Sequence, residues 1–397
     1  MSCPTCGRPF NGSESKMVSP YQLLNDSVNQ PSTGKLDKTT PRIPRLSAEL
    51  LSRIFTSCVA SLSTSNFPDV DYKNKTIGLA LTLGSVCQNW RTVSLKTPQL
   101  WNTVHLSSDL PVEIAEIWLA RSVPLPLDVQ FHIPPEVNIQ ADEDEDAEEE
   151  EVEYITDVRS IITEINRHVS RWRSVHFSVH PEMLSWFSLS QKANQPQRLD
   201  VLSLCLYSEE GDEVEVELQG VVPSKLWIMG YIEEIGIQWN NLTHLAFRNT
   251  TVRKCYEALS VVRQVQFCSF DTMQDEDEFA MQHPLILPSL DTLHLEHYPN
   301  SFWDCFIFPS LQTLHVLPAD PQLLVGVRSA IVRSKCQLKD LRILHQKETD
   351  QSEIIETLRL APSLKKLHIR GCSISDTFFE LMTALCKSIV GFRFFEA

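Results

Sequence analysis

The chain has 397 residues, of which 42% are hydrophobic and 22% charged, which is typical of a globular protein with two or three domains of roughly 150 residues each. Its formal net charge of −16 at pH 7 matches neither nucleic acid nor an anionic lipid surface, so we expect neither as a partner. Ten of the carboxylates lie in one run, residues 142–153, and the rest of the chain is only mildly acidic.

The cysteines and the hydropathy pattern indicate where the protein resides. Eleven cysteines in a chain of this length are too sparse for a disulfide scaffold, so free thiols in a reducing compartment are expected. The first thirty residues lack the apolar core of a signal peptide, and no uncharged apolar run approaches the ~18 residues of a membrane span. We therefore expect an intracellular protein, in the cytoplasm, the nucleus or both.

The N-terminal 42 residues are rich in Ser, Thr, Asn, Pro and Gly and have no sustained apolar period, which predicts a flexible tail. Cys3 and Cys6 in this segment have the spacing of half a zinc site. A structural zinc ion needs four ligands, and no second pair of Cys or His lies nearby in the sequence. A coincidental pair is therefore favoured over a metal site, and we expect no cofactor.

Residues 43–105 show apolar residues at helical spacing. The first stripe consists of Leu46, Leu50, Leu51, Ile54 and Phe55, with Ser47 as a candidate N-cap. After a polar stretch, residues 61–76, a second stripe consists of Leu79, Leu83, Val86, Cys87, Trp90 and Val93. The spacing predicts two or three short helices with a loop between them.

Three blocks of this segment resemble the F-box family. They are LSAELLSRIF at 46–55, VCQNWR at 86–91 and TPQLW at 97–101, in the order of the family's pattern. The chain departs from that pattern at Ser47, where the family usually has Pro, and in the polar insertion at 61–76. F-box proteins with degenerate leucine-rich repeats, a kind abundant in fungi, resemble the whole chain in architecture.

The resemblance implies a substrate adaptor of an SCF-type cullin-RING ubiquitin ligase, whose F-box helices dock on the small Skp-family linker protein. It also implies which side chains form the docking face or the small core beneath it: Leu46, Leu50, Leu51, Ile54, Phe55, Val86, Cys87 and Trp90. A helical unit needs its own core, so we expect about half of them to point inward.

Residues 106–170 are expected to connect the helical module to the rest of the chain. They contain a candidate helix at 112–121 and a strand-like segment at 125–131. The acidic run at 142–153 predicts a solvated loop, because like charges at this density repel one another in a compact form. A docking element for a basic partner is the alternative interpretation of the run.

The C-terminal part, residues 171–397, repeats an apolar-x-x-apolar-x-apolar hexad. The hexads begin at Trp172, Leu199, Leu242, Val262, Leu290, Leu311, Leu338, Leu364 and Ile389. Apart from one gap of 43, the intervals lie between 20 and 28 residues, as in leucine-rich repeats. Helical patterns at 321–335 and 351–360 separate the later hexads, and a degenerate unit around 226–229 could fill the long gap.

The expected fold class is therefore mixed: a small helical F-box-like module followed by an irregular leucine-rich-repeat solenoid, with a parallel sheet and helices on its convex side. Where the family commonly has Asn or Cys three residues after the hexad, only Cys372 conforms. The repeats should accordingly be irregular.

One residue of each hexad should project from the open face of the sheet, namely the one between its last two apolar positions. In order these are His176, Ser203, Ala246, Gln266, His294, His315, Arg342, His368 and Arg393. His294, His315, Arg342 and His368 would form a polar, partly basic row, which fits either target recognition or an ordinary solvated strand face. A metal site is not expected there, since Arg342 interrupts the row.

Catalytic motifs are absent from the sequence: there is no G-x-S-x-G, no phosphate-binding glycine loop and no H-E-x-x-H. We therefore expect a non-catalytic adaptor, with the linker protein and a cullin as partners of the helices and an unknown protein target on the repeats. A scaffold that acts outside a ubiquitin ligase is the first alternative. An enzyme built on a repeat scaffold is the second.

Overall fold

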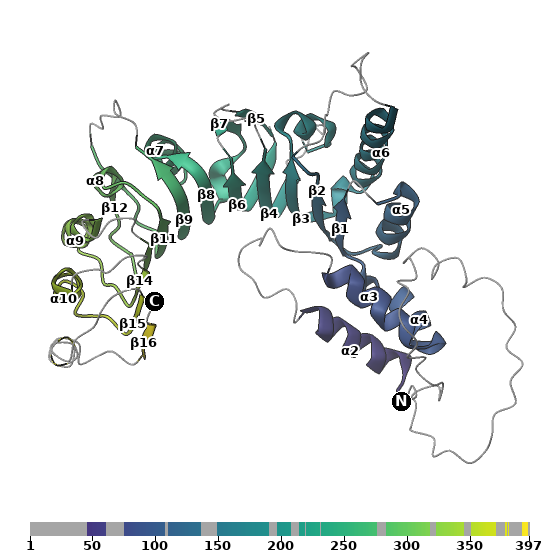
Figure 1. Ribbon diagram of the computed structural model, residues 1–397, viewed down its shortest axis with the longest axis horizontal. Coiled ribbons are helices and arrows are strands. Elements are labelled where there is room, and N and C mark those ends of the chain that lie inside the picture. Colours follow the sequence, from purple (N-terminus) through teal and green to yellow (C-terminus); the bar gives the residue numbers. More distant parts are fainter. Residues whose placement is uncertain are drawn as a thin grey trace, which may run out of the picture. The chain divides into compact units, whose positions relative to one another are not determined.

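A computed structural model of the chain shows two compact units (Figure 1). It describes residues 46–60, 75–107, 110–135, 149–189, 197–207, 214–218, 220–230, 232–275, 283–317, 323–344, 351–370, 378, 380 and 391–395. Unit 1 comprises Met1–His132 and Gln140–Ser174, and unit 2 comprises Ile133–Ile139 and Val175–Ala397. The expected flexible tail, with Cys3 and Cys6, lies outside the described residues.

Unit 1 combines helices with two short parallel strands. Its helices are α2 (Ala48–Ala60), α3 (Lys75–Val86), α4 (Gln88–Leu95), η1 (Pro98–Leu100), α5 (Val112–Arg121), α6 (Glu149–Asn166) and η2 (Val169–Arg171). Strands β1 (Thr103–Ser107) and β2 (Leu127–His132) pair in parallel. The helices predicted at 43–97 and 112–121 are confirmed as α2–α4 and α5. The expected connecting region therefore belongs largely to the same unit as the first three helices.

Helix α2 begins where the sequence predicts an N-cap. The hydroxyl oxygen of Ser47 accepts a hydrogen bond from the backbone N–H of Leu50, at 3.2 Å. This bond satisfies one of the N–H groups that the first turn of a helix leaves without a partner. Ser47 thus starts the helix through its side chain.

The acidic run corrects one expectation. Residues 142–148 lie outside the described part of the chain, but residues 149–153 form the start of α6 rather than a loop. Carboxylates are favoured in the first turn of a helix, where the N-terminal dipole end attracts negative charge. The helix is anchored in the core of unit 1 by a stripe of five buried side chains: Ile155, Val158, Ile161, Ile162 and Ile165.

Unit 2 is built on a large parallel sheet. Strand β3 (Trp172–Val179) crosses the boundary of the two units, and η3 (Pro181–Trp186) follows it. The sheet then continues, each strand parallel to the next, as β4 (Gln197–Leu206), β6 (Val221–Met229), β8 (His244–Thr251), β9 (Phe267–Gln274), β11 (Thr292–Glu296), β13 (Thr313–Leu317), β14 (Asp340–Leu344), β15 (Lys366–Arg370) and β16 (Gly391–Phe395).

The remaining elements of unit 2 connect these strands. They are the helices α7 (Val252–Val261), α8 (Ser301–Cys305), α9 (Leu323–Ser334), α10 (Gln351–Arg359) and η4 (Trp239–Asn241), and two small parallel pairs, β5 (Val214–Glu217) with β7 (Ile232–Gly236) and β10 (Leu285–Ile286) with β12 (Phe306–Ile307). Helices α8, α9 and α10 lie along one side of the sheet (Figure 1). We call the other side the open face.

The register of the strands explains why the hexads recur. Leu293, Leu314, Leu341 and Leu367 pair in register across β11, β13, β14 and β15, and all four are buried. Because strand residues alternate between faces, this places the leucines on the helix side and the residues between them on the open face. The strand in the long gap is confirmed as β6. The mixed α/β class with a large parallel sheet is thus as expected.

One hexad was assigned to the wrong residues. Strand β9 begins at Phe267, and Cys268 pairs with Leu245 and Leu293. The repeating unit of this strand therefore begins at Val265, three residues after Val262, because the segment offers apolar residues at both offsets.

A glycine in α9 tests the packing of this side of the sheet. Gly326→Ala should lower the midpoint of thermal unfolding, because the added methyl group would overlap the Trp303 ring and lie 2.9 Å from Asn300 Oδ1. Overpacking of this kind costs about 1–3 kcal/mol.

Gly78→Ala in α3 is the control. Its methyl group meets no described atom within 4 Å, so the better helix propensity of Ala should stabilise by about 0.5–1 kcal/mol. Shifts of the same sign in circular-dichroism melts of both variants would contradict this packing.

Candidate functional site

Helix α2 exposes an apolar stripe. Leu46, just before the helix, is 41% exposed, and within the helix Leu50 is 49% and Ile54 is 46% exposed. Residues four apart lie on one face of a helix, so these three side chains form a continuous strip, which we call the apolar stripe. Large apolar side chains gathered on one exposed face are typical of a protein-binding surface.

The other residues implied by the F-box resemblance lie deeper. Leu51, Phe55 and Cys87 are buried, and they therefore form core rather than a contact surface. Val86 and Trp90 are half-buried. The ring centroids of Trp90 and Phe55 are 5.0 Å apart, which fixes α2 against α4. Of the eight residues, the apolar stripe is thus the part that a partner can cover most directly.

The three sequence blocks come together in unit 1. Helix α2 packs against α4 and against η1, the short helix that carries the third block. The Thr97 hydroxyl lies 3.0 Å from that of Ser52, and the Trp101 indole N–H donates to the Ser94 carbonyl at 2.9 Å. Leu100 and Trp101 are both buried. The apolar stripe is therefore carried on a platform with an ordered interior.

The open face of unit 2 aligns the four residues singled out from the hexads. The register pairs His294 with His315, His315 with Arg342, and Arg342 with His368. On the other side of His294 the row continues through Ser269 rather than Gln266, which corrects the expectation for β9. Four side chains from distant parts of the sequence thus lie on neighbouring strands.

Aromatic rings are in contact along this face over four strands, and we call His244, Phe267, His294 and His315 the ring ladder. The ring centroids of His244 and Phe267 are 5.4 Å apart, and those of Phe267 and His294 are 4.9 Å apart. The rings of His294 and His315 are nearly parallel, with centroids 4.0 Å apart. The sequence predicted the two paired histidines but not Phe267 or His244, which stand two residues earlier in their strands.

The ring ladder is uncharged at neutral pH. Burial, and then the charge of Arg342, lower the pKa of His294 to about 4. Burial, followed by His294, Arg342 and His368, lowers the pKa of His315 to about 3. The Nε2 atom of His315 is buried without a hydrogen-bond partner among the described residues, so it can pair with a group that a ligand supplies.

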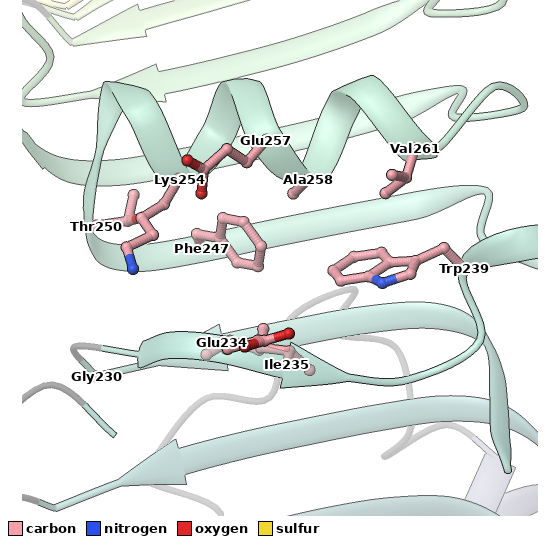
Figure 2. A pocket seen from close by; sticks show the side chains of 11 residues that line it. Gly230, Glu234, Ile235, Trp239, Phe247, Thr250, Lys254, Glu257, Ala258 and Val261 are labelled. Carbon is pink, nitrogen blue, oxygen red and sulfur yellow. The ribbon is translucent and has the colours of Figure 1, made fainter. Parts of the chain in front are cut away.

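A pocket lies on the helix side of unit 2 (Figure 2). Its volume is about 180 Å³, and Trp239 and Phe247 line it together with Lys254 and Glu257 of α7. Small-molecule and cofactor sites usually measure ~300–1,000 Å³, so this pocket is too small for a nucleotide and holds at most one ring or one branched side chain. Its described lining contains no His, Cys or Ser and therefore no nucleophile–base pair of those types.

Sequence reasoning missed this pocket because no single motif encodes it. Between β6 and β8 the chain forms the strand β7 and the short helix η4 instead of a regular helix, and α7 follows only after β8. The space lies where this irregular covering meets α7 (Figure 2).

No protein family model matches the chain, and no curated protein matches it. Within the described ranges, no helix is long and apolar enough to cross a membrane, and no group of three or more His, Cys, Asp or Glu side chains could hold a metal ion. A function must therefore be inferred from the apolar stripe and the open face.

The depressed pKa values of the ring ladder predict a pH effect on stability. In the unfolded chain, histidines become protonated below their ordinary pKa of 6.5. In the folded protein, His294 and His315 stay neutral until the pH falls to about 4 and about 3. The free energy of unfolding should therefore fall as the pH is lowered from about 6.5 to about 4. A His294→Gln, His315→Gln double variant should lose less stability over this window in urea unfolding.

The exposed His283 supplies the control for that measurement, because His283→Gln removes an ionisable ring outside the ladder. Comparison of its slope with that of the wild type measures the effect of removing one ring outside the ladder. An unchanged slope in the double variant would show that the two rings are not protected from protonation in the folded protein.

Proposed function

We propose that the protein is a non-catalytic substrate adaptor of an SCF-type ubiquitin ligase. Helices α2–α4 dock on the Skp-family linker protein, and the open face of an irregular leucine-rich-repeat solenoid binds a protein target. The observation that carries the proposal is the apolar stripe, which lies in the first F-box-like block beside that block's own buried residues, Leu51 and Phe55.

The apolar stripe provides the main gain of free energy in the proposed docking. Full burial of a Leu or Ile side chain is worth about 1.5–3 kcal/mol, and roughly half of that remains available to side chains that are about half exposed. Three such residues on one rigid helix face would act as the centre of an interface. The ordered core of Phe55, Trp90 and Trp101 spares the interface the cost of ordering α2 on binding.

The open face suits the second half of this role. It presents side chains that do not form the core, so they are available to a target without disturbing the leucine layer beneath. A target held there and a ligase held by the helices would be tethered by one chain. This raises the effective concentration of target lysines near the ubiquitin carrier, with no chemistry by the adaptor itself.

A double substitution in the apolar stripe tests the docking. Leu50→Asp, Ile54→Asp should reduce capture of the purified linker protein roughly tenfold or more, because two carboxylates would be placed in an apolar interface. Both side chains are exposed in the free chain, so the far-ultraviolet circular dichroism should be unchanged. Val261→Asp, Val332→Asp, at two exposed valines of unit 2, is the matched control and should bind the linker normally.

The capture experiment must also measure whether a cullin is recovered together with the linker protein. If wild type and the stripe variant recovered equally little linker protein, the adaptor role would be wrong. If the wild type recovered the linker protein but never a cullin, the chain would be a scaffold that acts outside a ligase.

A further inference from the structure

Two neighbouring strands of the open face, β14 and β15, carry a concentration of positive charge. Five exposed cations lie on β14, β15 and the residues that precede these strands, and we call them the basic patch: Lys339, Arg342, Lys365, Lys366 and Arg370. The only described carboxylate on the same two strands is Asp340. The chain as a whole has a net charge of −16, so the sign of this patch is opposite to that of the whole chain.

The sheet geometry directs this charge to the open face. On β15, Leu367 and Ile369 are buried, so Lys366 and Arg370 alternate to the side away from the helices. Asp340 neutralises little of the patch. Its Oδ1 atom lies 3.7 Å from Nε of Arg342, and the Arg342 side chain remains 44% exposed.

The basic patch adjoins the ring ladder. Arg342 pairs in register with His315, the last ring of the ladder, and His368 pairs with Arg342 from the other side. The lowered pKa values of His294 and His315, to which Arg342 contributes, reflect the same closeness. Cations and neutral stacked rings thus form one continuous surface.

We propose that the basic patch and the ring ladder together bind an acidic segment of the target, in which an aromatic side chain stands close to carboxylate or phosphate groups. The inference rests on the proposed function, since it names the chemistry of the segment that the open face selects. Anionic groups would pair with Lys366, Arg370 and Arg342. The aromatic ring would pack against the outer edges of His294 and His315, whose faces cover each other.

The spacing of the strands sets the spacing of such a motif. Neighbouring strands lie about 4.8 Å apart, so β15 is about 10 Å from β13, the strand of His315. An extended peptide covers about 3.3–3.6 Å per residue. The aromatic residue should therefore stand about three residues from the acidic ones.

Charge beyond the ladder favours a peptide over a nucleic acid. Asp271 and Glu296 pair in register on the open face of β9 and β11, close to the rings. Burial and the charge of Asp271 raise the pKa of Glu296, while Arg248, which pairs with Asp271 at 2.9 Å, lowers it. A uniformly anionic strand that crossed the ladder would meet them, whereas a peptide whose charge ends before its aromatic residue would not.

Binding of synthetic peptides to the purified full chain tests the inference. The probe is a fluorescently labelled peptide with a Glu cluster and a Tyr three residues away, compared with a Gln-for-Glu peptide and a phosphoserine-for-Glu peptide. The Glu peptide should bind roughly tenfold tighter than the Gln peptide, and less tightly at high salt. A further gain for the phosphoserine peptide would identify phosphate as the group read, and equal affinity would identify carboxylate.

Charge-reversal variants locate the binding surface. Lys366→Glu, Arg370→Glu should weaken binding of the Glu peptide roughly tenfold or more. Lys335→Glu, Arg359→Glu, at the ends of α9 and α10, makes the same change in net charge and should leave the affinity within about twofold. Equal losses in both double variants would overturn the inference, and so would equal binding of the Glu and Gln peptides.

Two further measurements separate the remaining outcomes. A short oligothymidylate that displaced the Glu peptide at an equal concentration would overturn the inference in favour of nucleic acid. Capture of the linker protein by the same variants gives the second readout. Patch variants should capture it as the wild type does, so a failed peptide test with intact capture would overturn this inference alone. A wild type that captured no linker protein would overturn the proposed function while the peptide result stood.

Discussion

Parallel strand pairing in strict register is the constraint on which unit 2 depends. Each strand places one leucine-like residue under the sheet and one residue on the open face at the same level as its neighbours, as in the pairs of His294 with His315 and of Leu293 with Leu314. A slip of one residue would exchange the two faces and bury His315 in place of Leu314. The buried layer therefore holds the alignment, and the ring ladder and the basic patch are consequences of it.

Unit 1 depends on a similar separation of two faces on one helix. Helix α2 has one broad apolar side, and the packing of Phe55 against Trp90 turns part of that side inward. Leu50 and Leu51 are adjacent in sequence and alike in chemistry, yet one is half exposed and the other buried. This division turns an ordinary amphipathic pattern into a surface with a free apolar side.

The sequence predicted those elements that are encoded by a few neighbouring residues. The Ser47 cap, helix α5 and the strands of the regular hexads were predictable because the local sequence signals agree there. Strand β9 was misplaced by three residues because Val262 and Val265 both begin an apolar pattern. Helix α6 was missed as a whole, because the charge density at its start outweighed the helical period of the isoleucines that follow.

The candidate sites were predictable only in part, for a different reason. The alignment of His294, His315 and Arg342 follows from the repeat and could be predicted from it. The depressed pKa values of the two histidines depend on burial and on the nearby charge of Arg342, and the depth of burial is not encoded by any spacing in the sequence. The pocket beside Trp239 depends on how the irregular segment between β6 and β8 packs against α7, which no sequence motif encodes.

The separation of the two faces of the sheet also affects how such a protein can diverge. Residues on the open face, such as Ser269 and Arg342, lie between buried neighbours but do not form the core. They can be exchanged one at a time at little cost in stability, and a whole strand-and-helix unit can be added without disturbing distant ones, since each unit contacts mainly its neighbours. Selection can therefore redirect this surface to a new target while the architecture stays constant, and two chains of the same fold need share almost no sequence on it.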